Sequence, residues 1–323
     1  MRASSHRSLC LLWYRSSTLN LIITKSGGRF LAACLALLTL ALLTLASGPA
    51  LAQNQPAGID PAVLAKANAG DAAAEFQVAG AYQQGDIVPR DFVQASAWYL
   101  KAATQGYTQA QYRLGLLYQQ KESGIMKDDA QAAIWLRKAA DQGDASAQAA
   151  LAVCYTKGLG VPQDNAQAAS WFQKGAAQNS PQAMEGLALL YERGLGVGKD
   201  GKQAFALLQK AAALEDAEAE YQLAIDFENG QDTKKDKKQA EDWYSKAAQQ
   251  GHIWAQYNLG QMLVSKPADA YFWLSLAMNQ LEGDPLIKAT ALHDDAASKL
   301  SPTQKSQADD RINAWHPTPI AHP

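Results

Sequence analysis

Residues Gly143 to Asn179 read GDASAQAALAVCYTKGLGVPQDNAQAASWFQKGAAQN, and this stretch decides the fold. It is one unit of a repeat that returns, shortened or altered, from about residue 70 to about residue 278. The units begin at Gly70, Gly106, Gly143, Asn179, Glu215 and Gly251, in steps of 36 or 37 residues. A fixed period of this length is typical of an array in which each unit packs on its neighbours.

The first half of each unit has the pattern of a helix, which we call its A helix. Alanine lies four residues after each start, at Ala74, Ala110, Ala147, Ala183, Ala219 and Ala255. An aliphatic residue lies eight after it, at Val78, Leu114, Leu151, Leu187, Leu223 and Leu259. Steps of four keep these side chains on one helix face. A glycine in the left-handed conformation is predicted to end the helix at Gly85, Gly124, Gly158, Gly194 and Gly230.

The second half predicts another helix, the B helix. We expect its N-caps at Asp91, Asp128 or Asp129, Asp164, Asp200 and Asp236. A large residue follows seven positions later, at Trp98, Trp135, Trp171, Leu207 and Trp243, with a lysine three further on. The tryptophans suit either a ligand-stacking stripe or a core, and helical spacing favours the core. The lysines suit the negative end of the helix dipole.

Three motifs therefore recur in phase: A-x-x-x-L-[GA]-x-x-Y, G-x-G-V-x-x-D and W-x-x-K-A-A. Together they resemble the Sel-one-like repeat (SLR) family, relatives of the tetratricopeptide repeats. The resemblance implies an all-α, right-handed α-solenoid of about six helix-turn-helix repeats, used for protein–protein contact in secretion, envelope assembly and signalling. A secreted, cysteine-rich branch carries a β-lactam-hydrolysing activity. This chain lacks the paired cysteines, so that activity is not carried over.

The chain divides around this array. Residues 1–52 form a leader, 53–69 a linker and a short helix beginning near Pro61, and 70–278 the array. Its sixth unit is shortened, with Ser265-Lys266-Pro267 in place of the glycine turn, as expected of a cap. Residues 279–315 are predicted to form C-terminal capping helices near 286–299 and 303–314, with Ile312 and Trp315 against the array. The proline-rich tail 316–323 is predicted to be disordered.

The leader has the parts of a secretory signal peptide. It contains five basic residues and no acidic one, an apolar segment at 30–47, and Ala50-Leu51-Ala52 as a cleavage site. This predicts a periplasmic or secreted protein of Gram-negative type. The alternative is an inner-membrane anchor at residues 30–52, the only membrane contact we expect. A lipobox ending at Cys34 fits less well, because Cys34 begins the apolar run instead of ending it.

Composition excludes several function classes. Without the five leader bases, 24 basic residues face 31 acidic ones, a net charge of −7 that argues against a nucleic-acid partner. Cys154 is the one cysteine after the leader, so neither a disulfide nor a zinc cluster is expected. No histidine pair, nucleophile motif or phosphate-binding loop is found. We therefore predict no cofactor, no metal and no enzymatic activity.

What varies between units is the other side of the A helices. An apolar strip rimmed by polar residues there predicts a concave groove for a peptide or partner helix. The candidate groove residues are Gln77, Arg113, Leu116, Val153, Leu189, Gln222, Ile225, Trp254, Asn258 and Gln261. Packing between neighbouring units would explain some of them equally well. The basic run Lys234–Lys238 is either a solvated loop or a contact for an acidic partner.

The functional hypothesis is a non-enzymatic scaffold or adaptor of the cell envelope that binds a protein or peptide. Two alternatives remain at this point. One is an envelope hydrolase like the secreted β-lactamase-type repeat proteins, and the other is an exported factor directed at a host.

Overall fold

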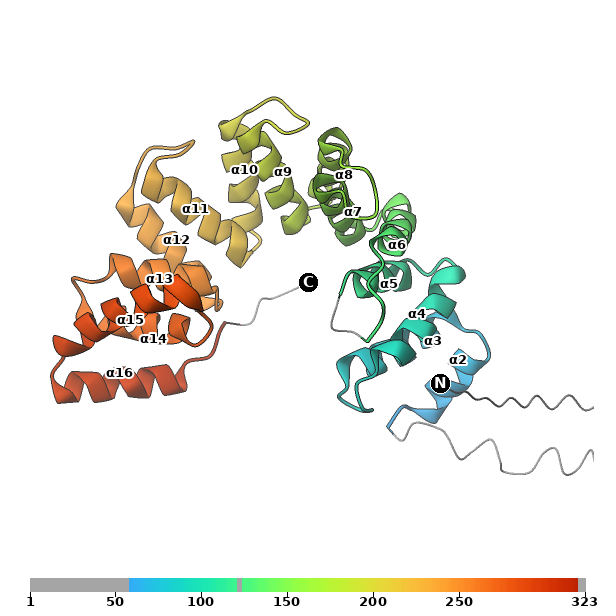
Figure 1. The fold of residues 1–323 in the computed structure, drawn as a ribbon, viewed down its shortest axis with the longest axis horizontal. Coiled ribbons are helices and arrows are strands. Elements are labelled where there is room, and N and C mark those ends of the chain that lie inside the picture. Colours follow the sequence, from blue (N-terminus) through green and yellow to red (C-terminus); the bar gives the residue numbers. More distant parts are fainter. Residues whose placement is uncertain (1–57, 121–123, 319–323) are drawn as a thin grey trace, which may run out of the picture. The chain divides into compact units, whose positions relative to one another are not determined.

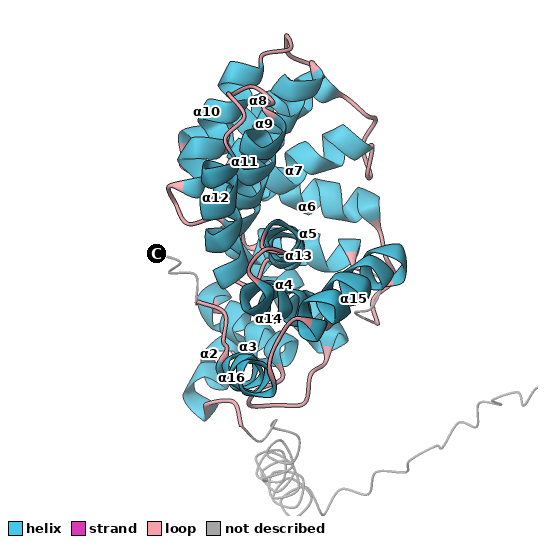
Figure 2. Cartoon of the chain, turned by 90° about the vertical axis from the view of Figure 1, so that its left-hand side faces the viewer, coloured by secondary structure: helices cyan, strands magenta, loops and turns pink. Residues whose placement is uncertain are grey.

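A computed structural model describes residues 58–120 and 124–318, all within one compact unit, Ala57–Pro323. In this part of the chain the structure contains only helices and loops (Figures 1 and 2). The all-α expectation is therefore confirmed for these residues. The predicted signal peptide, anchor and most of the linker lie outside the described residues. No helix in the described ranges is long and apolar enough to cross a bilayer.

Six A–B helix pairs follow a short first helix, α2 (Pro61–Asn68). The pairs are α3 (Ala72–Gln84) with α4 (Phe92–Thr104), α5 (Thr108–Gln119) with α6 (Asp129–Asp141), α7 (Ala145–Lys157) with α8 (Asn165–Ala177), α9 (Pro181–Arg193) with α10 (Gly201–Ala212), α11 (Ala217–Asn229) with α12 (Lys237–Gln249), and α13 (Ile253–Met262) with α14 (Pro267–Met278). Each helix packs on the next one in the chain, and α7 also packs on α9 (Figure 1).

The predicted helix boundaries follow from local capping. Every expected B-helix aspartate is an N-cap, Asp128 being the one used in the second unit. For example, Asp164 Oδ1 accepts hydrogen bonds from the Ala166 and Gln167 amides at 2.9 and 3.0 Å. Gly85, Gly158, Gly194 and Gly230 close their A helices in the left-handed conformation. The prediction for Gly124 is wrong: α5 ends at Gln119 with Gln120 extended, so Gly124 lies in the following loop.

The B-helix tryptophans belong to the core, as their spacing favoured. Trp135 and Trp171 are buried, while Trp98 and Trp243 are half-buried against core clusters. The lysine three residues later does more than complement the helix dipole. Its ammonium group lies over the indole ring, with Nζ 3.6 to 3.9 Å from the ring centre, in the pairs Lys101–Trp98, Lys138–Trp135, Lys174–Trp171 and Lys246–Trp243. These cation–π contacts cover the outer edge of the core.

A row of buried amide side chains ties neighbouring units together. Gln148 on α7 donates to the Ala140 carbonyl of the preceding B helix at 3.2 Å and accepts from Gln178 of its own unit at 2.8 Å. Gln111 makes the equivalent pair of bonds, to Ala103 and from Gln142. The fourth unit has Met184 and Leu214 at these two positions instead. In the fourth unit an apolar pair thus takes the place of the hydrogen-bonded amide pair.

Two further helices follow the sixth pair, α15 (Gly283–Ser298) and α16 (Pro302–Ala314). Ile312 and Trp315 pack against the last core cluster, as predicted. Tyr271 on α14 donates a hydrogen bond to Asp309 on α16 at 2.7 Å. The start of the predicted disordered tail is also held: the Thr318 amide donates to the Gln249 carbonyl at 2.9 Å. Residues 319–323 lie outside the described residues.

Candidate functional site

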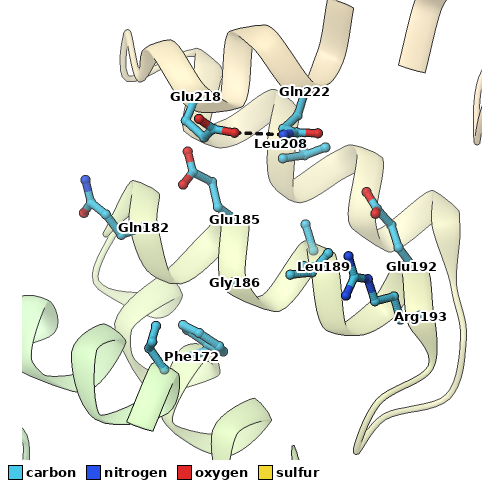
Figure 3. Close-up of a pocket in the computed structure, with 12 residues that line it drawn as sticks. Phe172, Gln182, Glu185, Gly186, Leu189, Glu192, Arg193, Leu208, Glu218 and Gln222 are labelled. Atoms are coloured by element: carbon cyan, nitrogen blue, oxygen red, sulfur yellow. Dashed lines mark hydrogen bonds between the residues drawn. The ribbon is translucent and has the colours of Figure 1, made fainter. Parts of the chain in front are cut away.

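All ten predicted groove residues lie on the A helices, and none of them is buried. The structure brings three of them together, Val153 on α7, Leu189 on α9 and Gln222 on α11. They line one cavity of about 500 Å³ (Figure 3). A second cavity, of about 200 Å³, shares Val153 with the first and extends the hollow surface to Tyr112 on α5. Together the two cavities form a depression across α5, α7, α9 and α11 that three of the ten candidate residues line.

The floor of the larger cavity is apolar. It is formed by Phe172 from α8, Leu208 from α10, and Ala188 and Leu189 from α9. Leu189 remains 38% exposed, so an apolar side chain is available at the surface. Phe172 reaches this surface from its B helix because the facing A helix is narrow at that point. The narrow point is Gly186, where a Cβ atom would overlap the Phe172 ring.

The walls of the same cavity carry an excess of acidic groups. Glu185 and Glu192 come from α9 and Glu218 from α11, against one base, Arg193. Figure 3 shows the Glu185 side chain extending toward Glu218, whose carboxyl group is directed at Gln222. Glu218 is held by Gln222 Nε2 at 2.8 Å and by His252 Nε2 at 3.1 Å. Glu185 Oε1 is buried and has no hydrogen-bond partner among the described residues.

The carboxyl groups of Glu185 and Glu218 titrate in opposite directions. Burial, together with the neighbouring Asp216 and Glu218 carboxyl groups, raises the pKa of Glu185 to about 9. The hydrogen bond with His252 lowers the pKa of Glu218 below its ordinary value. Glu185 is therefore protonated and Glu218 ionised at neutral pH. Further along the groove, burial and Asp232 raise the pKa of Glu192.

We expect the stability of the array to fall between about pH 4 and pH 9. Burial raises the pKa of Glu220 and of Asp226 to about 7, in addition to Glu185 at about 9. A raised pKa means that the folded chain binds the proton more tightly than the unfolded chain. The stabilisation is complete below the ordinary carboxyl pKa of about 4 and is lost as pH rises through the folded pKa. Melting temperatures at pH 5, 7 and 9 should decrease in that order.

The Glu185→Gln variant provides the comparison for this prediction, because glutamine keeps the shape of the side chain but does not titrate. It should lose less stability than the wild type between pH 7 and pH 9. Glu282→Gln, at the exposed start of α15, is the matched control and should behave as the wild type does. A Glu185→Gln profile parallel to the wild type would contradict the assignment.

The remaining predicted residues are distributed elsewhere. Asn258 and Gln261 line a third cavity, of about 490 Å³, with Lys235 and Lys237 from the basic run. Both amides are already bonded within the fold, Asn258 to Tyr244 at 3.2 Å and Gln261 to Tyr257 at 3.0 Å. The other five line none of these cavities: Gln77, Arg113, Leu116, Ile225 and Trp254. Of these, Trp254 is 43% exposed and touches Tyr257 edge-on.

Sequence reasoning missed the acidic wall and Phe172. Glu185 and Glu192 lie on A helices at positions outside the rows that supplied the candidate groove residues, whereas Glu218 lies in the row of Trp254, three residues after its unit start. Phe172 directly follows the core residue Trp171. The sequence pattern places Phe172 in the core as well and does not indicate that its ring also lines the cavity. The clue was Gly186, the one glycine among the residues seven after each unit start. A glycine inside a helix often marks a close approach by a neighbouring side chain.

The described residues contain no group of three or more histidine, cysteine, aspartate or glutamate side chains placed to hold a metal ion. Cys154 on α7 is buried, and Gln119 Nε2 donates to its sulfur at 3.2 Å. Burial raises the pKa of this thiol, which is the environment of an unreactive cysteine.

Comparison with known proteins places this geometry among related arrays. A sequence model of the Sel1 repeat family matches residues 72–107, 108–144, 145–180, 181–216 and 217–252. A Sel1 repeat protein from Oxalobacter formigenes has 30% sequence identity and a TM-score of 0.56, over 72% of this chain and 87% of its own. A protective antigen with an SLR fold from uropathogenic Escherichia coli, c5321, has 25% sequence identity and a TM-score of 0.49. The match covers 78% of this chain and 66% of the antigen. A search of the curated proteins gave no match.

Proposed function

Because the chain belongs to the Sel1 repeat family, we propose that it is a non-enzymatic scaffold that binds a peptide or helix of a partner protein along its A helices. Sel1 repeat proteins typically act as protein-interaction scaffolds. The proposal adds a surface to that general role: the depression that crosses α5, α7, α9 and α11. The observation that carries it is the cavity of about 500 Å³ that brings Val153, Leu189 and Gln222 together.

The physical reasons favour a segment of another protein as the occupant. The two cavities share lining residues and follow one another across successive A helices, which suits a long narrow ligand better than a compact one. Leu189 and Trp254 expose large apolar surfaces at separate points, as anchors for such a segment. The leader sequence supports a periplasmic or secreted location for this contact, with residues 30–52 as an anchor if the leader is retained.

Affinity capture from a cell-envelope fraction tests this proposal. The variant combines Arg113→Ala, Leu116→Ala, Leu189→Ala and Trp254→Ala, four residues of α5, α9 and α13 that are not buried. We expect it to recover at least tenfold less partner than the wild type, because anchor residues dominate the binding energy. Its helical circular dichroism should be unchanged.

The matched control replaces four exposed residues of the B helices with alanine: Val93, Leu100, Ile134 and Lys210. It should capture the partner as well as the wild type does. Loss of capture in the control but not in the groove variant would place the contact on the B helices. The mass of the chain recovered from the same fraction distinguishes cleavage after Ala52 from a retained anchor.

A further inference from the structure

We propose that the cavity between α7 and α11 takes a cationic segment of the partner protein, which presents an arginine or lysine side chain beside a large apolar one. The inference rests on the proposed function and specifies the chemistry of the ligand. The cavity has two halves that lie next to each other, an apolar floor and an acidic wall.

The apolar half provides a seat for one large side chain. Phe172, Leu208 and Leu189 come from three consecutive helices and face the same space (Figure 3). Leu189 is partly exposed, whereas Phe172 and Leu208 are only 3% and 2% exposed. The bottom of the floor is therefore buried, and its upper edge still exposes apolar surface to water. Covering that surface favours an aliphatic or aromatic residue of the ligand.

The acidic half has more acidic than basic side chains. Glu185, Glu192 and Glu218 line the cavity with a single base, Arg193, near Glu192. Behind them, Asp216 lies beside Glu185, and Asp226 and Asp232 lie close to Glu192. The His252 ring is hydrogen-bonded to Glu218 on the same wall. The wall thus combines acidic groups from α9, α11 and the loop that follows α11.

Crowding of like charges makes this wall complementary to a cation. The Glu185 side chain extends toward Glu218, and its Oε1 atom has no partner among the described residues. Burial, and after it the neighbouring Asp216 and Glu218 carboxyl groups, raise the pKa of Glu185. An ammonium or guanidinium group placed between Glu185 and Glu218 would allow Glu185 to lose its proton, so that two carboxylates accept hydrogen bonds from the cation. An acidic segment would be repelled by the ionised Glu218 instead.

A random twelve-residue peptide library displayed on phage, selected on the full chain, provides the test. We expect enriched peptides to share an arginine or lysine next to a leucine, isoleucine, phenylalanine or tryptophan. A synthetic peptide of the enriched sequence, labelled with fluorescein, then gives the dissociation constant from fluorescence anisotropy. Glu185→Gln combined with Glu218→Gln should weaken binding at least tenfold, and Leu189→Ala should weaken it as well.

Controls keep this test specific. Glu282→Gln and Ile287→Ala change an exposed acid and an exposed apolar residue at the start of α15, and both should bind as the wild type does. Higher salt should weaken the wild type more than the doubly substituted chain, because fewer charges remain to be screened in the latter. Circular dichroism and melting curves show that each variant is folded.

The outcomes separate this inference from the function on which it rests. Enriched peptides without a basic residue, or peptides that the double variant binds as tightly as the wild type, overturn the cationic inference. If the variant with alanine at Arg113, Leu116, Leu189 and Trp254 no longer binds such peptides, the proposed scaffold function stands. If no peptide is enriched, or every enriched peptide survives that variant, both the inference and the proposed groove fail.

Discussion

Replacing Gly160 with alanine is expected to lower the free energy of unfolding by about 3 kcal/mol, a large effect for a single substitution in a surface loop. Gly160 has φ of +69°, a conformation that alanine adopts only with strain. A Cβ atom there would also overlap the Asp129 carbonyl at the start of α6. The second glycine of the G-x-G turn therefore packs on the B helix of the preceding unit.

Gly198→Ala is the control for this prediction. Gly198 lies in the equivalent loop of the next unit, and a Cβ atom there would meet no other atom within 4 Å. Its replacement should change the denaturation midpoint very little. Equal destabilisation by the two substitutions would show that the close packing on α6 is not what makes Gly160 necessary.

The contact between the second residue of the turn and the preceding B helix also appears in the fourth and fifth units. It explains why glycine is replaced by aspartate in the turn of the fifth unit. Gly196 packs on Asn165 at the start of α8 in the same way. In the fifth unit Asp232 takes the place of the second glycine, with φ of +57°, and its carboxyl group occupies the space beside Gly201 at the start of α10. A small residue is therefore needed on one side of this contact, and either side can provide it.

Trp171→Ala and Trp254→Ala should separate stability from binding. Trp171 is 6% exposed and belongs to the core cluster that includes Leu151 and Phe172. The ammonium group of Lys174 lies over its ring. Its truncation should cost about 3–5 kcal/mol because a large cavity is left in the core. Trp254 is 43% exposed, so its truncation should cost little stability but weaken partner binding.

Denaturant unfolding followed by circular dichroism measures the first effect, and the capture assay measures the second. The two tryptophans act as controls for each other, since both changes remove the same side chain. Equal destabilisation by the two, or normal capture by Trp254→Ala, would contradict the division between core and binding residues. Because an array can unfold in parts, the midpoints should be compared with at least two probes.

Much of the fold was predictable because the same local rules act in each unit. The spacing of Ala147, Leu151 and Tyr155 indicated one helix face, and the Asp164 N-cap indicated where the next helix begins. The prediction failed at Gly124, where the loop after α5 is longer than in the other units and the glycine no longer adjoins the helix end. Spacing between units also could not show that Gly160 touches Asp129, a contact between residues of different repeats.

The candidate site was predictable in outline only. Comparing units identified Val153, Leu189 and Gln222 as variable surface residues, and they line one cavity. The pattern could not show that Phe172 reaches the same cavity from a B helix, since that depends on the missing side chain at Gly186. Nor could it show that Glu185 extends toward Glu218, because their distance depends on how α9 and α11 pack.

Site-specific photocrosslinking in cells tests the central claim most directly. A photoreactive amino acid at position 189, on the exposed edge of the cavity, is compared with one at position 134, where Ile134 is 47% exposed on α6. The account predicts a discrete crosslinked partner protein from position 189 and none from position 134. A partner crosslinked from position 134 and not from position 189 would contradict the claim that the A helices form the binding surface.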